Sequence, residues 1–495
     1  MNSSKSSPKR ENKTSFKAIS PFDLFYQLTY MSAMASSGIA RGKVFEIAAH
    51  SSSTAAEYFV AINTLVEEMR YDYPEACRHI GLQAKSDNIK SFLLRMSDAL
   101  RSGEPLADFL AREAEVQGED YTNEYERNLE ALKQWSNAFS SITISVALIV
   151  IIQVISSMIS SLNAPMMLGL MSSGVMLTGF GAWIIKRSAP REIITVKASE
   201  GSAEQRQAMR LFKLLVPLGV AGAMVLVMVG VPLGLVLIIL AALLLPIGLI
   251  SSRSDKKTNK KDEEFSTFMR SVGGTASSSG TTLKQALTSI DLSSFPTLED
   301  DIDRLSTRLQ ALVEPEICWN QFGKETGSKL ISEVVGIFYG AIKIGGDPER
   351  VGYLCSLFTS KTSRLRAKRR LASGMFAGLV TVMQAVIAGL MVFVLSIVLN
   401  FAEMVVQLMP SNEAAVEGQT TINMGMASFT PEELQFLSTL TMVTIILMAI
   451  VTALAIIMGD GGYKLKMAMY LSLTIFISGV SMLVVPPVVA NVLSV

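Results

Sequence analysis

The sequence predicts an all-α polytopic membrane protein with about seven transmembrane helices and two homologous cytoplasmic helical modules. Hydrophobic residues make up 49% of the 495-residue chain and charged residues only 18%, against about 25% in average globular domains. The mean hydropathy of +0.39 agrees with this. Lys and Arg leave gaps wide enough for membrane helices, and a glycine–acid–proline pattern recurs late in the chain.

The first 20 residues are polar and basic and contain no apolar segment of the kind found in secretory signal peptides. We therefore expect residues 1–20 to be a disordered cytoplasmic tail. The formal net charge of +1 gives no field that would attract nucleic acid, so no nucleic-acid partner is expected.

The cysteines Cys77, Cys318 and Cys355 are far apart, and the chain has only two histidines. This spacing favours neither a zinc site nor a disulfide framework. We expect three buried free thiols and no cofactor.

A membrane helix needs about 20 mainly apolar residues. The gaps between basic residues predict seven such spans, of which the third and fourth form a tight pair joined at VGVPLG. Near the end of the chain, Pro486 and Pro487 are expected to break the last helix. The predicted spans are 139–161, 166–186, 213–230, 231–251, 374–401, 437–458 and 468–489.

Basic residues alternate with segments that have none, which by the positive-inside rule places the N-terminus in the cytoplasm and the C-terminus outside. In the external loop, Thr430 and Pro431 are expected to begin the sixth span as cap and first helical residue. The predicted organisation is a tail at 1–20, a first cytoplasmic module at 21–138, four spans at 139–252 with a short cytoplasmic loop at 186–213, a second module at 253–373, a fifth span at 374–402, an external acidic loop at 403–436, and two spans at 437–495.

Two distant segments repeat one order of features: SDALRSGEPLADFL and GAIKIGGDPERVGYL. Gly103 and Gly345 within them are 242 residues apart, and so are Gly38 and Gly280, which follow small residues in both copies. A fixed offset at two separate places indicates duplication of a helical module.

The repeated turn has a simple physical reading. Gly103, and Gly345 or Gly346, can end a helix in the left-handed conformation. Pro105 and Pro348 can then begin the next helix. The intervening acids, Glu104 and Asp347, favour the positive end of that helix, and Asp347 is the better cap. A bundle corner explains these residues, and direct contact of the exposed acid with a partner is the alternative.

Charged stretches offer candidate docking surfaces. The segment 361–370, KTSRLRAKRR, holds six cations and no acid, and 253–261 holds five cations and one acid. The positive charge that usually flanks membrane spans, together with attraction to anionic lipids, explains both segments. The alternative is that either segment binds an acidic surface of a partner. The segment 104–130 has nine acids and two bases, which predicts either a solvated helix face or a surface for basic residues of a partner.

The segment SGEPLADFL, followed by a helix and a span and repeated as GGDPERVGYL, resembles the F-domain family of type II secretion systems and type IV pilus machines. This family comprises inner-membrane platform proteins. The chain is most similar to the archaeal branch, which contains the archaellum platform, since bacterial platforms have about three spans and this chain has seven.

The resemblance implies a non-enzymatic scaffold without cofactors. Its partners would be a hexameric secretion ATPase, pilin-like or archaellin subunits, and membrane lipids. It also implies a homodimer, which no pattern in the sequence shows. The candidate ATPase-docking residues are Lys361, Arg364, Arg366, Lys368, Arg369, Arg370, Glu104, Asp108, Asp347 and Glu349.

Other functions stay open. The platform of an adhesive pilus or of a type II secretion-like system would have the same pattern. A transporter is disfavoured because the repeat lies in the cytoplasmic parts. A prepilin-type peptidase needs two aspartates and a GxGD motif, whereas IMGDGG has Ile457 in place of the first glycine and no second aspartate is expected at another span's edge.

Overall fold

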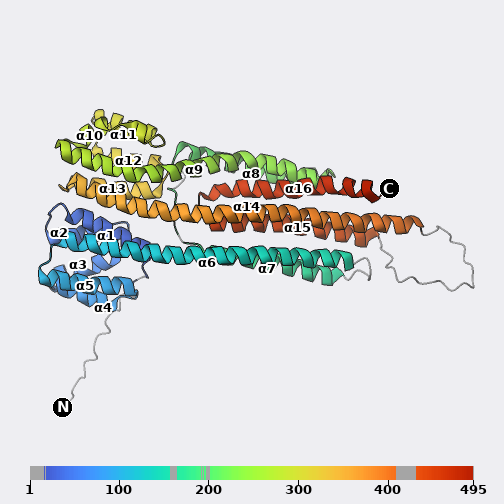
Figure 1. The fold of residues 1–495 in the computed structure, drawn as a ribbon, viewed down its shortest axis with the longest axis horizontal. Coiled ribbons are helices and arrows are strands. Elements are labelled where there is room, and N and C mark those ends of the chain that lie inside the picture. Colours follow the sequence, from blue (N-terminus) through green and yellow to red (C-terminus); the bar gives the residue numbers. More distant parts are fainter. Residues whose placement is uncertain are drawn as a thin grey trace, which may run out of the picture. The chain divides into compact units, whose positions relative to one another are not determined.

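The computed structural model describes residues 16, 18–156, 164–190, 192, 194–196, 201–408 and 431–493. Within these ranges the chain is built of sixteen α-helices and two short 3-10 helices, and the only β-structure is an isolated bridge between Thr195 and Ser328 (Figure 1). The predicted all-α class is confirmed. The turn before α7 lies partly outside the described residues, and so does Thr430, the expected cap of the sixth span.

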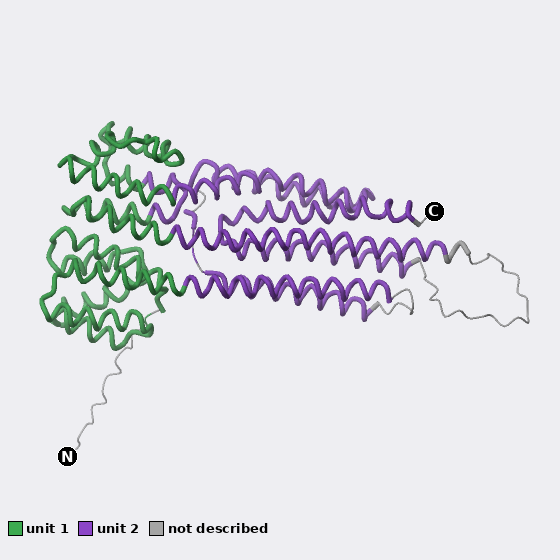
Figure 2. Tube along the Cα trace, viewed as in Figure 1, with its two compact units in different colours: residues 1–124, 263–320, 333–362 green, residues 125–262, 321–332, 363–495 purple. Residues whose placement is uncertain are grey.

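The chain divides into two compact units (Figure 2). Unit 1 comprises residues 1–124, 263–320 and 333–362, and unit 2 comprises 125–262, 321–332 and 363–495. Three long helices contribute residues to both units. They are α6 (Leu106–Ser156), α9 (Leu233–Ser279) and α14 (Pro348–Leu408).

The two predicted modules have the same helices in the same order. In the first module α6 is preceded by α1 (Pro21–Ala35), α2 (Arg41–Ala49), α3 (Ala56–Met69), α4 (Tyr73–Gln83) and α5 (Asp87–Ser102). In the second, α9 is followed by α10 (Leu283–Ser289), the 3-10 helix η1 (Leu292–Ser294), α11 (Glu299–Gln310), α12 (Pro315–Glu325) and α13 (Lys329–Lys343), and then by α14. Helices α2, α4, α5 and α6 begin 242 residues before α10, α12, α13 and α14. The repeat found at two glycines therefore extends over the whole module.

Backbone conformation repeats with the same offset. Positive φ angles occur at Gly38 and Gly280, at Gly103 and Gly345, and at the two non-glycine residues Arg70 and Leu312. Left-handed backbone is rare for residues with a side chain. Its recurrence at equivalent positions shows that the duplicated modules share their turns as well as their helices.

The repeated turn differs in one detail from the prediction. Pro348 begins α14, and the Asp347 carboxylate accepts a hydrogen bond from the Arg350 amide at 3.1 Å, as expected of a cap. Pro105, however, stands just before α6, where its carbonyl accepts from the amide of Phe109 at 3.1 Å. Glu104 is thus one residue too early to cap α6, and its carboxylate pairs with Arg112 instead.

The first module has its own apolar core, formed by α1 to α5 and the start of α6. Phe45, Phe59 and Phe92 are completely buried in it, and each such side chain contributes about 1.5–3 kcal/mol by leaving water. The three cysteines are buried and free, as predicted. Burial raises the pKa of the Cys77 thiol to about 12.

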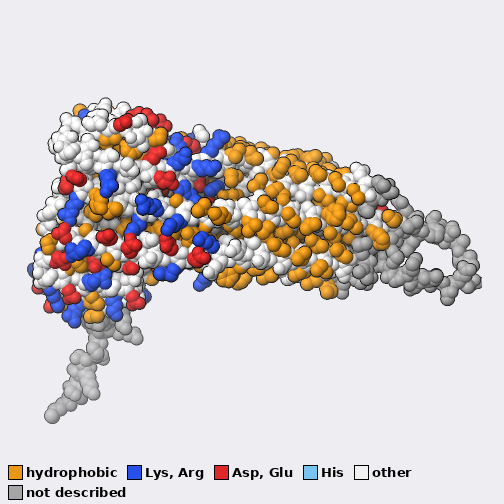
Figure 3. All heavy atoms as spheres, viewed as in Figure 1, with side chains coloured by type: hydrophobic (Ala, Val, Ile, Leu, Met, Phe, Trp, Pro, Cys, Tyr) orange, Lys and Arg blue, Asp and Glu red, His pale blue; other side chains and the backbone are white. Residues whose placement is uncertain are grey.

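Seven described helices are long and apolar enough to span a membrane, in agreement with the predicted number. They are α6, α7 (Ala164–Ser188), α8 (Ala203–Met228), α9, α14, α15 (Pro431–Asp460) and α16 (Met467–Leu493), with the 3-10 helix η2 (Lys464–Lys466) before α16. On the face drawn in Figure 3, hydrophobic side chains cover the spans of unit 2, and most Lys, Arg, Asp and Glu side chains lie over unit 1.

One prediction about the spans is wrong. Pro486 and Pro487 lie inside α16, which runs on to Leu493. Membrane helices tolerate proline because neighbouring helices and local adjustments satisfy the backbone groups that it frees. The break that the sequence predicted would hold for a helix in water, where the freed carbonyls gain solvent partners.

The spans pack through small and polar residues. A Cβ on Gly234 of α9 would lie 2.9 Å from the carbonyl oxygen of Gly479 of α16, so these backbones touch only because both residues are glycine. Nearby, Gln384 of α14 donates to the Ser478 hydroxyl at 3.3 Å and accepts from the Thr452 hydroxyl at 3.2 Å. This is the helix–helix role expected of a polar residue in a span.

We predict that Gly345→Val destabilises the protein by about 1–2 kcal/mol, because a side chain disfavours left-handed backbone, while the space around Gly345 is open. Gly336→Ala is the matched control, since Gly336 lies in α13 with open space around it and negative φ. It should stabilise by about 0.5–1 kcal/mol. Thermal unfolding in detergent measures both variants, and equal unfolding midpoints would contradict the left-handed conformation of Gly345.

Candidate functional site

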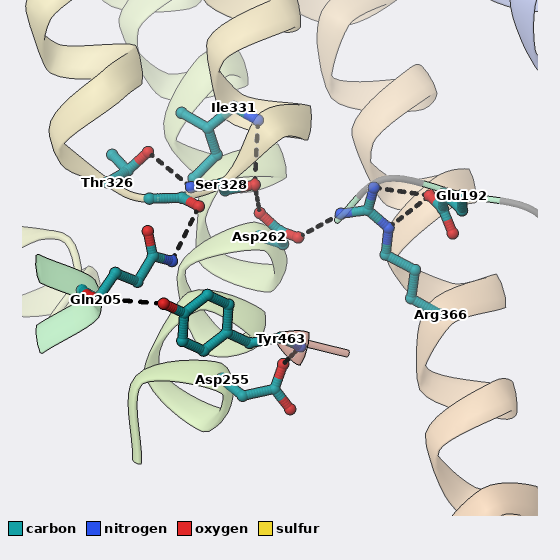
Figure 4. A network of polar contacts seen from close by, with 10 residues as sticks. Glu192, Gln205, Asp255, Asp262, Thr326, Ser328, Ile331, Arg366 and Tyr463 are labelled. Atoms are coloured by element: carbon teal, nitrogen blue, oxygen red, sulfur yellow. Dashed lines mark hydrogen bonds and ion pairs between the residues drawn. The ribbon is translucent and has the colours of Figure 1, made fainter. Parts of the chain in front are cut away.

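Buried charges from three parts of unit 2 meet at one guanidinium (Figure 4). Arg366 of α14 donates to the carboxylate of Asp262 on α9 at 2.7 Å. It also donates, at 2.6 Å, to the carboxylate of Glu192, which lies in the loop between α7 and α8. Their side chains are 3%, 2% and 5% exposed, respectively. We call these three residues the ionic junction.

Both carboxylate oxygens of Asp262 have hydrogen-bond partners, whereas Oε2 of Glu192 is buried without one among the described residues. A guanidinium holds its donors in a planar fork and can serve two carboxylates at once. The Ser328 hydroxyl, in the turn between α12 and α13, donates to the second oxygen of Asp262. Burial raises the pKa of Asp262, and the Arg366 charge and the Ser328 hydrogen bond oppose that rise.

The same loop is attached to two further elements. Arg369 of α14 donates to the carbonyl of Pro190 at 2.9 Å, and also to the carbonyl of Gly459 at the end of α15 at 3.0 Å. Beyond Glu192, the Ile194 carbonyl accepts from the amide of Lys329, the first residue of α13, at 3.0 Å. The loop between two spans is therefore fixed to α14 on one side and to the α12–α13 turn on the other.

A second group of buried charges surrounds Lys466 before α16. Its ammonium contacts Asp255 of α9 at 3.1 Å and Asp460 of α15 at 2.7 Å. Burial alone would lower the pKa of Lys466, but the two carboxylates outweigh it and hold the pKa above its ordinary value. A cavity of about 10 Å³, about the size of one water, lies among Asp255, Asp460, Arg366 and Arg369.

This geometry corrects the expectation that Asp460 has no second aspartate near it. Asp255 contacts the same Lys466 ammonium as Asp460 does. Sequence analysis did not identify Asp255, because it lies about 200 residues earlier, among the cations after the fourth span. A proton-sharing dyad needs two carboxylates in mutual contact, whereas here Lys466 binds both. The arrangement is that of a structural ion cluster.

Helical spacing sorts the basic segment 361–370 into two stripes. Arg366, Arg369 and Ser373 lie at intervals of three and four residues and are all buried. The two arginines, each 3% exposed, are therefore not available to a docking partner, which corrects their inclusion among the docking candidates. Arg370 is half-buried beside the cavity.

The other stripe, 361, 364 and 368, faces outward. Lys361 pairs with Glu119 at 2.5 Å, and Lys368 pairs with Glu126. Both acids lie on α6. Arg364 is exposed. Two acids of the segment 104–130, for which basic residues of a partner were one expectation, are thus paired with cations of the same chain.

Of the predicted acidic candidates, Asp108 pairs with Arg350 at 2.6 Å, and Asp347 and Glu349 are exposed. The latter two line an open cleft of about 540 Å³ in unit 1. Its other walls include Arg270 and Tyr353, with the guanidinium 5.1 Å from the ring centre. No sequence pattern singled out these two, because Arg270 lies on α9 and Tyr353 on α14.

Residues 28–154 match the family model of type II secretion system (T2SS), protein F. The matched residues begin within α1, cover the rest of the first module and end within the first span, near the end of α6. The resemblance drawn from the sequence is thereby confirmed, and the second copy of the same helices follows at the 242-residue offset.

Two relatives extend the similarity beyond that domain, and both are named Flagella accessory protein J. The protein of Methanococcus voltae is 23% identical over 441 residues, covering 86% of this chain and 77% of the relative. That of Methanocaldococcus jannaschii is 25% identical over 333 residues, covering 62% of this chain and 56% of the relative. No solved structure matches the chain.

We predict that Arg366→Met destabilises the protein by about 3–5 kcal/mol, because Asp262 and Glu192 would remain buried without their cation. Arg364→Met removes an exposed arginine two residues away and should change stability by less than about 0.5 kcal/mol. Thermal unfolding in detergent compares the two variants, and an Arg366→Met protein as stable as wild type would contradict the assignment of the junction.

Proposed function

We propose that this multi-pass membrane protein is the platform of an archaeal type IV pilus-like machine, most closely the archaellum. In this proposal a hexameric secretion ATPase docks on the cytoplasmic modules, and its motions drive pilin-like subunits into the growing filament and rotate it. The protein acts as a non-enzymatic scaffold, with the N-terminus in the cytoplasm. The F domain supports a platform of this general kind, and the relatives named Flagella accessory protein J favour the archaellum over the adhesive-pilus and secretion-system alternatives.

The observation that carries the proposal is the continuity of α6, α9 and α14. Each contributes residues to both compact units without interruption. An α-helix transmits displacement along its axis because every turn is hydrogen-bonded to the next. A partner that moves the module end of such a helix therefore acts directly on a membrane span.

The proposal also assigns a role to the ionic junction. Arg366 holds α14 to α9 and to the loop that connects α7 and α8. A displacement of α14 would then be shared with spans that are not continuous with it. A transporter would instead place its buried charges near the middle of the spans, whereas Asp255 and Asp262 follow the apolar run of α9.

For the ATPase we propose the cleft of the second module as the docking site. Asp347 and Glu349 are exposed there, beside Arg270 stacked on Tyr353. Tyrosine and arginine are the residue types enriched at the energetic centres of protein interfaces. At equivalent positions 242 residues earlier, the first module has Leu28 in place of Arg270 and Ala111 in place of Tyr353, so the two modules would differ in docking.

We predict that Glu349→Lys reduces co-purification of the cognate secretion ATPase with the detergent-solubilised protein by about tenfold, as expected for reversal of one interface charge. Glu299→Lys is the matched control, because Glu299 is also an exposed acid in the first turn of a helix. It should bind the ATPase as wild type does.

Two outcomes would contradict parts of this proposal. Equal binding by both variants would move the docking site away from the cleft while leaving the platform function. No binding even by wild type, at low salt and in every nucleotide state, would count against the platform itself. Neutralising the whole 361–370 segment is a poor test, because it would also remove the buried Arg366 and Arg369.

A further inference from the structure

Three ion pairs join α6 to α14, and each links residues that are 242 positions apart. They are Asp108 with Arg350 at 2.6 Å, Glu119 with Lys361 at 2.5 Å, and Glu126 with Lys368. The value of 242 is also the offset of the duplicated modules. Every pair therefore connects equivalent positions of the two copies.

This pattern defines how the helices meet. Along each helix the paired positions are 11 and then seven residues apart, which is close to three and then two turns, so they lie on one face. Equivalent residues face each other in a parallel pair of identical helices related by a two-fold axis. Helices α6 and α14 thus make, within one chain, the contact expected of a symmetric dimer.

The charges break that symmetry in a consistent way. All three members on α6 are acids, and all three on α14 are bases. Two α6 helices meeting through this face would place acid against acid at each position, and two α14 helices would place base against base. Like charges that face each other disfavour pairing.

We propose that these three pairs act as a charge key, which makes α6 and α14 of one chain mutual partners and excludes pairing of either helix with its counterpart in a second copy. A homodimer of this protein then forms through another surface. The paired side chains are mostly exposed, with Glu119 62% and Lys368 58% accessible. Such pairs select partner and register more than they add stability. The proposal stands independently of any ATPase.

The first experiment measures pairing within one chain. Asp108→Cys and Arg350→Cys are introduced together and joined by a short bismaleimide in membranes, which the buried native cysteines do not disturb. Reversing α6 with Glu119→Lys and Glu126→Lys should lower this cross-link about fivefold, as two lost ion pairs and two new repulsions predict. Adding Lys361→Glu and Lys368→Glu should restore it.

The matched control for folding is Glu115→Lys with Asp120→Lys. These are also exposed acids of α6, and the change of charge is the same. The key predicts that this control keeps the wild-type cross-link. An equal loss in the control, an unchanged cross-link in the reversed helix, or no recovery in the fourfold variant would each overturn the proposal.

The second experiment measures pairing between copies, with Asp108→Cys alone in two differently tagged chains. One chain carries the reversed α6 (Glu119→Lys, Glu126→Lys) and the other the reversed α14 (Lys361→Glu, Lys368→Glu). Together they present one basic and one acidic α6, so co-expression should produce a cross-link between tags that neither chain forms alone. A cross-link between two Asp108→Cys copies whose other charges are all wild type would overturn the exclusion.

Discussion

The buried guanidinium of Arg366 is the interaction on which the arrangement of unit 2 depends. Removing three charges from water is unfavourable, and the mutual attraction of Arg366, Asp262 and Glu192 offsets that loss only when every donor is well placed. What the junction adds is therefore geometry rather than net stability. It admits one relative placement of α9, α14 and the α7–α8 loop, and through the Ser328 hydroxyl it extends to the α12–α13 turn.

The duplication explains much of the remaining charge distribution. The acids of α6 and the bases of α14 form two complementary faces in equivalent positions of the two modules. Each exposed pair contributes only about 0–1 kcal/mol, so the apolar contacts hold the helices and the charges set their register. Phe139 of α6 against Phe376 of α14, with ring centres 5.9 Å apart, is one such contact. Continuous helices then carry this register from the modules into the spans.

Periodicity and composition determined the fold class, the seven spans, the repeated turn at Gly103 and Gly345, and the buried cysteines, because these depend on local pattern. The ionic junction could not be predicted, since its members lie far apart in the chain. A run of six cations contains two helical stripes, and sequence alone does not tell which faces inward. The stripe with Arg366 is buried and that with Arg364 exposed. The continuous α16 was missed because proline rules derived for water fail in a span.

We propose that the ionic junction transmits displacement between spans, and one triple variant tests this directly. Glu192→Leu, Asp262→Leu and Arg366→Met together replace the buried ions by apolar side chains, a change that in other proteins leaves stability equal or higher. If the junction transmits displacement, this variant is folded and membrane-inserted but no longer supports filament assembly in cells, as counted by electron microscopy. Wild-type filament numbers from the same folded variant would show that the junction only holds the helices together, and would contradict transmission through it.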